Sequence, residues 1–398
     1  MSRSSAALNN LRACAILSLL AFHSVLAYLR YLPDAPFGFD QAPYRWTAFP
    51  MVDPERWLGF DIFCGFQDVY LMSLMFFLSG LFVWPSLVRK GEAAFLQGRF
   101  VRLCVPAALV ILILMPLAHY PTYGVTAVDP SVAAYAQHWL ALPFWPSGPP
   151  WFLWQLFVFN LAVVALCGTA PWWCRRLARL ASTARTDPRR YFWRLLAVSA
   201  LAYVPLAVVF GPLRWYDYGI FAFQLSRPLH YAVYFLAGFG VGMFGLERGL
   251  LTADGALAQR WGTWLATALA AFVLWMGVTG LSMEPHAIAA THIAAGLTFV
   301  LSCAASCFAL LALFVRFAAR RTPLLDKAAE YSYGLYLVHY VFVVWLQYAL
   351  LDAQLPAILK GALVFAGVVA LSWATVSALQ RVPGAWRLLV GWVGREAA

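Results

Sequence analysis

Charged side chains are scarce in this sequence, since Asp, Glu, Lys and Arg make up 11% of its 398 residues. Soluble proteins average about 25%, so a soluble protein is excluded. No internal repeat or low-complexity segment is visible. The seven cysteines are odd in number and scattered, which excludes a disulfide framework. No folded basic domain is present that could bind nucleic acid, despite a formal net charge of +11.

Apolar residues are abundant, at 63% of the chain. A helix needs about 20 apolar residues to cross roughly 30 Å of hydrocarbon. Ten runs meet this need: 11–30, 68–88, 101–119, 151–170, 195–211, 229–246, 261–282, 290–315, 331–351 and 357–379. We predict an all-α polytopic membrane protein with about ten transmembrane helices, both termini cytoplasmic, and one domain over residues 1–398. The first run lacks a small-residue cleavage site and is expected to be a retained helix.

The basic residues indicate the orientation. With both termini cytoplasmic, the inner side holds 22 of the 28 Lys and Arg, including Arg387 and Arg395, and the outer side holds six. The positive-inside rule favours this arrangement. Seven of the inner arginines lie within residues 173–194, where they could bind anionic lipid headgroups or act only as a topology anchor.

Arg12 and His23 share the first predicted helix. Their spacing of 11 residues places them about 20° apart around the axis and about 16 Å apart along it. A histidine at membrane depth is costly unless it faces a polar cavity, where the neutral ring can act as a general base. The alternative is a histidine that only bonds a neighbouring helix. Arg12, at the cytoplasmic edge, can bind a phosphate or carboxylate.

Two further groups of polar residues stand at predicted helices. Arg99 and Arg102 share one helical face and suit a polyanion such as a nucleotide phosphate, although snorkelling is an equal alternative. Ser332, Tyr336 and His339 follow an i, i+4, i+7 pattern, so they line one face of the ninth predicted helix. Such a stripe faces a cavity, or anchors the helix at the membrane interface.

Two long outer loops, 31–67 and 120–150, are rich in aromatic and acidic residues. Flat aromatic faces and carboxylates suit a sugar. The alternative is that the aromatic residues only mark the membrane interface, where they are common in any membrane protein. The residues proposed for such contacts are Trp46, Trp57, Trp139, Trp145, Trp215, Tyr216, Asp61, Asp68, Asp217 and Glu284.

Five motifs, in this order, resemble the type-3 integral-membrane acyltransferases. They are Arg12 with His23, Phe76-Phe77-Leu78-Ser79-Gly80-Leu81-Phe82, Arg99-x-x-Arg102 with Pro106, Pro150-Trp151-Phe152-Leu153-Trp154, and Ser332-Tyr333-Gly334-Leu335-Tyr336-Leu337-Val338-His339. The length and the lack of a fused soluble domain are most similar to the members that modify periplasmic glucans. One departure is Leu11, where the family often has an acidic residue before its arginine.

The resemblance implies transfer of an acetyl or succinyl class acyl group from cytoplasmic acyl-CoA to a hydroxyl of an extracytoplasmic carbohydrate. His23 would be the general base, Arg12 would line the donor's path, and Arg99 and Arg102 would bind the CoA phosphates. No metal and no bound cofactor is implied. Ser79, Trp151, Ser332, Tyr336 and His339 would line the site.

The family implies a location in the bacterial cytoplasmic membrane. A transporter or flippase for a lipid-linked saccharide is the alternative, although it usually shows paired broken helices in two halves. A third reading is an assembly subunit without catalysis. The sequence indicates no oligomeric state.

Overall fold

The computed structural model describes residues 3–382 and 384. Within them the regular secondary structure is helical apart from one antiparallel hairpin of β1 (Trp215–Tyr218) and β2 (Phe221–Gln224). The helices are α1 (Arg3–Val25), α2 (Leu58–Leu81), α3 (Val83–Lys90), α4 (Glu92–Leu109), α5 (Met115–Thr126), α6 (Val132–Ala141), α7 (Trp151–Thr169), α8 (Pro171–Ser182), α9 (Pro188–Phe210), α10 (Pro228–Phe244), α11 (Ala256–Gln259), α12 (Trp261–Ser282), α13 (Ala289–Phe317), α14 (Pro323–Ala349) and α15 (Ala357–Gln380).

Each of the ten predicted apolar runs falls on a helix. Eight helical stretches in the described residues are long and apolar enough to cross a membrane. The other two predicted spans correspond to α10, which is 17 residues long, and to α14, whose polar stripe lowers its hydropathy. The protein is therefore an all-α polytopic membrane protein, as predicted.

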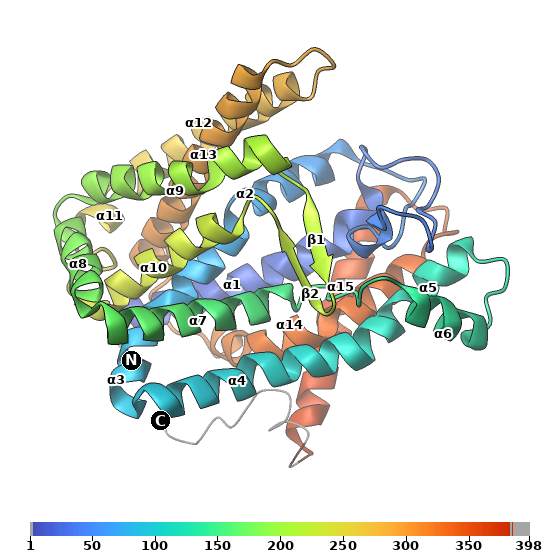
Figure 1. The fold of residues 1–398 in the computed structure, drawn as a ribbon, viewed down its shortest axis with the longest axis horizontal. Helices are drawn as coiled ribbons and strands as arrows, with labels where there is room; N and C mark the ends of the chain where they lie inside the picture. Colours follow the sequence, from blue (N-terminus) through green and yellow to red (C-terminus); the bar gives the residue numbers. More distant parts are fainter. Residues whose placement is uncertain (1–2, 383, 385–398) are drawn as a thin grey trace.

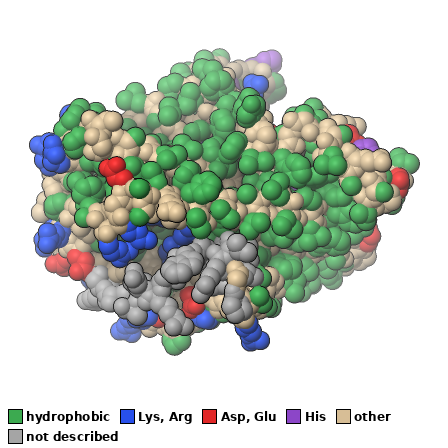
Figure 2. Space-filling view, turned by 60° about the horizontal axis from the view of Figure 1, so that its bottom comes forward, with side chains coloured by type: hydrophobic (Ala, Val, Ile, Leu, Met, Phe, Trp, Pro, Cys, Tyr) green, Lys and Arg blue, Asp and Glu red, His purple; other side chains and the backbone are tan. Residues whose placement is uncertain are grey.

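The long helices form a bundle with two distinct ends (Figure 1). The loop end, at the right, gathers residues 26–57 and α6, and the basic end, at the left, gathers α3, α8 and α11. Figure 2 shows hydrophobic side chains over most of one face, with most of its Lys and Arg toward the left. By the positive-inside rule we expect the basic end to face the cytoplasm. The predicted inner residues Arg387 and Arg395 lie outside the described residues.

The two outer loops are shorter than the sequence predicts. α2 begins at Leu58, so Asp61 and Asp68 lie on a helix and not in a loop. The Asp61 carboxylate accepts the backbone N–H groups of Arg30 at 2.9 Å and Tyr31 at 3.3 Å, so this charged group in the first turn of α2 has partners within the protein. Within residues 120–150, α6 adds a short helix that no apolar run predicted.

The third span is interrupted by proline, and aromatic side chains compensate for the lost hydrogen bonds. A π-helical turn over Val110–Leu114 joins α4 to α5, and Pro116 and Pro121 lack the N–H groups that would bond earlier carbonyls. The indole N–H of Trp145 donates to the Ile111 carbonyl, and that of Trp345 donates to the Leu117 carbonyl, both at 2.9 Å. Released carbonyls inside a membrane need such partners.

α2 and α10 approach each other closely at three glycines. A Cβ atom on Gly238 would lie 2.0 Å from the Phe77 carbonyl oxygen, and one on Gly242 would lie 2.0 Å from that of Leu81. On Gly80 it would lie 2.2 Å from the Phe235 carbonyl oxygen. Small residues four apart permit this contact between membrane helices.

Two ion pairs at the loop end fix the helices there. The Lys360 ammonium group donates to both oxygens of Asp53, at 3.0 and 2.8 Å, and ties the first outer loop to α15. The Arg227 guanidinium donates to both Asp68 oxygens, at 2.8 and 2.6 Å, and ties α10 to α2. With Arg56, which pairs with Asp34 at 3.4 Å, at least three of the six cations predicted on the outer side are neutralised within the protein.

Candidate active site

α1 lies inside the bundle and is held at both ends by amide side chains. It packs against α2, α13, α14 and α15. Near its start, the Asn10 amide donates to the carbonyls of Ala318 at 2.7 Å and Arg320 at 3.0 Å, just beyond the end of α13. Near its end, the Gln347 amide donates to the carbonyls of His23 at 3.0 Å and Ser24 at 3.2 Å. Carbonyls at a helix end lack partners in the helix, so these bonds satisfy them.

His23 and His339 form a pair between α1 and α14. The His23 Nδ1 and His339 Nε2 atoms are 2.9 Å apart, and the ring centroids are 5.1 Å apart. His339 is fully buried, whereas His23 keeps some accessible surface. Tyr340 packs edge-on against the His23 ring, with centroids 5.4 Å apart. His339 is the last residue of the i, i+4, i+7 stripe, and its hydrogen-bond partner across the helix interface is His23.

The hydrogen bonds determine which nitrogen of each neutral ring carries the proton. The His339 Nδ1 atom lies 2.7 Å from the Tyr336 carbonyl oxygen, which can only accept, so this nitrogen is the donor. In a neutral ring the His339 Nε2 atom is then an acceptor, and His23 Nδ1 must donate to it. This assignment follows from the partners. Among the described residues the lone pair of His23 Nε2 then has no hydrogen-bond partner. That lone pair can accept a proton.

Three arginines lie on the basic-end side of this pair. Arg12 on α1 is within electrostatic reach of Arg102 on α4, which is also an electrostatic neighbour of Arg99. The Arg12 guanidinium donates to the Asn9 Oδ1 atom at 3.2 Å. Asn9, one turn before Arg12, thus supplies the local oxygen that Leu11 does not. Arg102 is thus an electrostatic neighbour of both other arginines, and such an arrangement favours an anionic ligand.

α14 connects the arginines to the histidines. Tyr333 on α14 donates a hydrogen bond to the Arg102 carbonyl, and the Arg102 guanidinium lies over the Tyr333 ring at 5.8 Å. His339 follows Tyr333 by six residues, which is about 9 Å along a helix. Arg102 and the imidazole pair therefore both contact α14, at different heights along its axis.

The other predicted lining residues occupy different positions. The Tyr336 hydroxyl donates to the Pro149 carbonyl, and the Ser332 hydroxyl donates to the Ala329 carbonyl at 2.8 Å. Trp151 begins α7 and stacks on Tyr231, with centroids 5.9 Å apart. In the described residues Trp151 has ring contacts with Phe152, Trp215 and Tyr231, and none with either histidine of the pair.

Ser79 is also separate from the pair. Its hydroxyl donates to the Met75 carbonyl within α2 at 2.8 Å, and its neighbour Gly80 makes the contact with α10. The structure thus brings Tyr336 and His339 together with His23. It leaves Ser79 and Trp151 to the aromatic packing around α2, α7 and α10.

Two further buried histidines lie outside the motifs named in the sequence analysis, which gives them no role. His119 is fully buried among Trp46, Trp139 and Tyr340, and neither ring nitrogen has a hydrogen-bond partner in the described residues. Because Tyr340 also contacts His23, His119 lies one ring beyond the pair toward the loop end. Its position one residue before Tyr120 and two before Pro121, at the end of an apolar run, was the available signal.

His230 is the second of these histidines. Its Nδ1 atom is 2.7 Å from the Ser199 hydroxyl and its Nε2 atom is 3.1 Å from the Ser73 hydroxyl. Its Nε2 atom is also 3.6 Å from the Cys303 sulfur. These contacts join α2, α9, α10 and α13. Within the described residues no group of three or more His, Cys, Asp or Glu is arranged to hold a metal ion.

Comparison with known proteins agrees with the family that the motifs resemble. The sequence matches the family described as an acyltransferase domain, acyltransferase 3, over residues 5–377. A search of curated proteins and one of solved structures find no significant match. Because the matched region spans nearly the whole chain and includes all five motifs, the protein belongs to the acyltransferase 3 family and is a membrane acyltransferase.

Proposed function

We propose that this protein transfers an acyl group from cytoplasmic acyl-CoA to a hydroxyl group of a carbohydrate on the outer side of a bacterial cytoplasmic membrane. The observation that carries the proposal is the hydrogen-bonded series from the Tyr336 carbonyl through His339 to His23, which leaves His23 Nε2 as a free base. Within this class, the modification of glucans is the proposed role.

The donor binds from the basic end. Arg99 and Arg102 hold the phosphates of CoA, and Arg12 lies beside the path of the donor. The electrostatic proximity of the three arginines supports this assignment. The pantetheine arm then follows α14, so that the thioester carbonyl reaches His23.

His23 removes the proton of the acceptor hydroxyl. The alcohol oxygen attacks the thioester carbonyl carbon, the tetrahedral intermediate collapses, and the C–S bond breaks. The imidazolium of His23 returns its proton to the CoA thiolate, so the enzyme ends in its starting state. Positioning of the reactants contributes up to about 7–11 kcal/mol, and general base catalysis contributes about 10²–10⁴-fold.

The acceptor approaches from the loop end. The side chains around His119 supply flat aromatic faces, and the buried Trp139 Nε1 atom has no hydrogen-bond partner among the described residues. Such groups suit the faces and hydroxyls of a sugar. The carboxylates of Asp61 and Asp68 bind groups within the protein, so we assign them no contact with the sugar.

The proposal is tested in proteoliposomes with labelled acetyl-CoA or succinyl-CoA on the side of the basic end and a glucan on the other. The expected result is label covalently attached to the glucan. Movement of saccharide across the membrane without acylation would instead establish a transporter. Label on a lipid or a protein acceptor would retain the acyltransferase and overturn the carbohydrate acceptor.

A further inference from the structure

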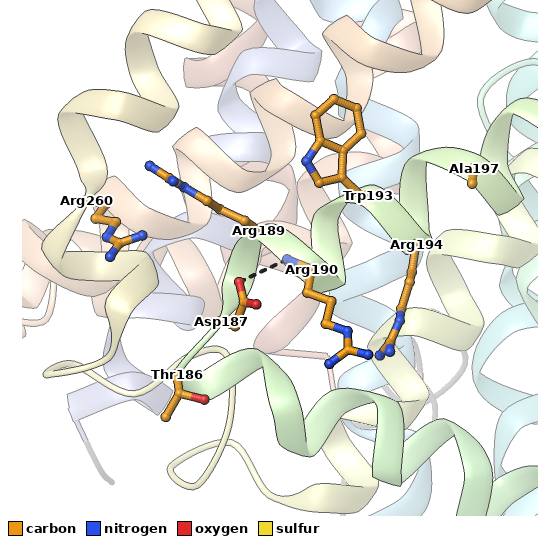
Figure 3. Close-up of a pocket in the computed structure, with 8 residues that line it drawn as sticks. All are labelled: Thr186, Asp187, Arg189, Arg190, Trp193, Arg194, Ala197 and Arg260. Carbon is orange, nitrogen blue, oxygen red and sulfur yellow. Dashed lines mark hydrogen bonds between the residues drawn. The ribbon is translucent and has the colours of Figure 1, made fainter.

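A basic pocket lies at the basic end, where the first turns of α9 meet the start of α12 (Figure 3). Its volume is about 750 Å³. Four arginines line it, Arg189, Arg190, Arg194 and Arg260, with Asp187 as the one acidic residue of the lining. The Asp187 carboxylate accepts the Arg190 backbone N–H at 3.1 Å and so caps α9. The pocket is therefore strongly positive.

The charges of this pocket are not neutralised by the protein. In the described part of the chain, none of the four arginine side chains has a hydrogen bond or an ion pair. The loop-end cations Arg227 and Lys360, in contrast, are each bound to a carboxylate. Unpaired like charges repel each other, so an external anion would stabilise this group.

An apolar groove continues from the basic pocket along the two helices. It shares Arg189, Trp193 and Arg260 with the pocket, and its volume is about 150 Å³. Its floor is aromatic, because the rings of Phe192 on α9 and Trp264 on α12 are 5.3 Å apart. α9 and α12 both pack against α13 and face outward from the bundle over most of their length. The groove thus opens toward the lipid.

We propose that the pocket and the groove together bind an anionic phospholipid of the inner leaflet. The arginines hold its phosphate, since a guanidinium matches two phosphate oxygens. One acyl chain lies in the groove over Phe192 and Trp264. Trp193, which is 62% exposed, stands between the two parts, at the level where indole rings sit in a membrane.

The basic pocket continues into the apolar groove, and this combination favours an anionic phospholipid over other ligands. A soluble polyanion would use the basic pocket and leave the groove empty, whereas a zwitterionic lipid would not use the excess of positive charge. An anionic phospholipid matches both halves at once. Positive charge near the inner leaflet attracts anionic headgroups by about fivefold in affinity for each arginine, or about 1 kcal/mol.

Retention of lipid by the full-length protein in detergent tests the proposal. Native mass spectrometry would measure binding of phosphatidylglycerol, cardiolipin and phosphatidylcholine. We expect Arg189→Gln with Arg260→Gln to weaken binding of the two anionic lipids about thirtyfold. The control, Arg175→Gln with Arg179→Gln, removes two exposed arginines of α8 that lie outside the pocket, and it should leave binding unchanged.

A second variant tests the groove without changing charge. Thr267 lines the groove, so Thr267→Trp should fill it and weaken binding of both anionic lipids, with inorganic pyrophosphate binding unaltered. Wild-type lipid binding in the Arg189/Arg260 variant would overturn the proposal. So would wild-type lipid binding in Thr267→Trp, which would reduce the site to a charged surface. Loss of acyl-CoA binding with lipid binding intact would assign the pocket to a soluble polyanion instead.

Discussion

The hydrogen bond between His339 and His23 predicts that a substitution of His339 slows acyl transfer through its effect on His23. If His339 Nε2 fixes His23 with its proton on Nδ1, removing the acceptor should slow the chemical step and leave donor binding intact. The variant His339→Phe keeps a flat ring of similar size and cannot accept a hydrogen bond. The variant His339→Gln keeps an amide oxygen that can accept from His23 and an amide N–H that can donate to the Tyr336 carbonyl.

The expected magnitude follows from the burial of the pair. His339 is fully buried, so in the phenylalanine variant the His23 Nδ1–H loses its partner where no protein group replaces it. An unsatisfied buried donor costs about 1–3 kcal/mol. Since about 1.4 kcal/mol corresponds to tenfold in rate, full expression of this cost in the chemical step would lower kcat roughly five- to 150-fold.

The assay is steady-state transfer of label from acyl-CoA in proteoliposomes, with thermal unfolding measured on the same preparations. We expect His339→Phe to lower kcat with an unchanged KM for acyl-CoA, and His339→Gln to recover most of the lost rate. A role in packing alone would lower the unfolding temperature and would not favour glutamine over phenylalanine. Wild-type turnover in His339→Phe, or equal rates in the two variants, would refute the reasoning.

Three further predictions concern donor binding and stability. Arg99→Ala or Arg102→Ala should weaken acyl-CoA binding in isothermal calorimetry by about tenfold, the effect of one charged hydrogen bond; wild-type affinity in both variants would return these residues to a lipid-anchor role. Gly242→Ala places a Cβ 2.0 Å from the Leu81 carbonyl oxygen and should lower the unfolding temperature, in keeping with an overpacking cost of about 1–3 kcal/mol. Lys360→Met leaves Asp53 charged and buried, at a cost of about 3–5 kcal/mol, whereas adding Asp53→Leu should restore most of the stability; an equally unstable double variant would contradict this.

Controls for these variants come from the same molecule. Arg89→Ala removes an exposed arginine at the basic end and should leave acyl-CoA affinity unchanged. Gly277→Ala adds a Cβ to α12 where no heavy atom lies within 4 Å, so the unfolding temperature should not fall. A fall as large as that of Gly242→Ala would remove the argument from close packing of α2 and α10.

Hydropathy and helical periodicity predicted the helices and the faces on which their polar residues lie. The ten runs fell on helices, and the spacing of 11 residues placed Arg12 and His23 on one helix. The start of α2 was placed ten residues too late because its first turns contain Asp61 and Asp68. Their partners, the Arg30 backbone and the Arg227 guanidinium, lie elsewhere in the chain. A hydropathy window cannot detect such compensation.

Contacts between helices that lie far apart in the chain could not be predicted from the sequence. His23 and His339 are 316 positions apart, and Lys360 is 307 positions from Asp53. Periodicity identified the polar stripe on the predicted ninth helix, but it could not identify His23 as the partner of His339. His119 belongs to no polar stripe, and its neighbours Trp46, Trp139 and Tyr340 come from three separate segments of the chain. Only the packing of the helices reveals these clusters.

The central claim is that His23 is the base of acyl transfer, and a single-turnover measurement tests it most directly. Protein loaded with labelled acyl-CoA and mixed with acceptor would be compared for wild type, His23→Ala and His292→Ala, which removes an exposed histidine near the start of α13. The account predicts normal donor loading in all three and no label transfer in His23→Ala alone. Transfer by His23→Ala at the wild-type rate would contradict it.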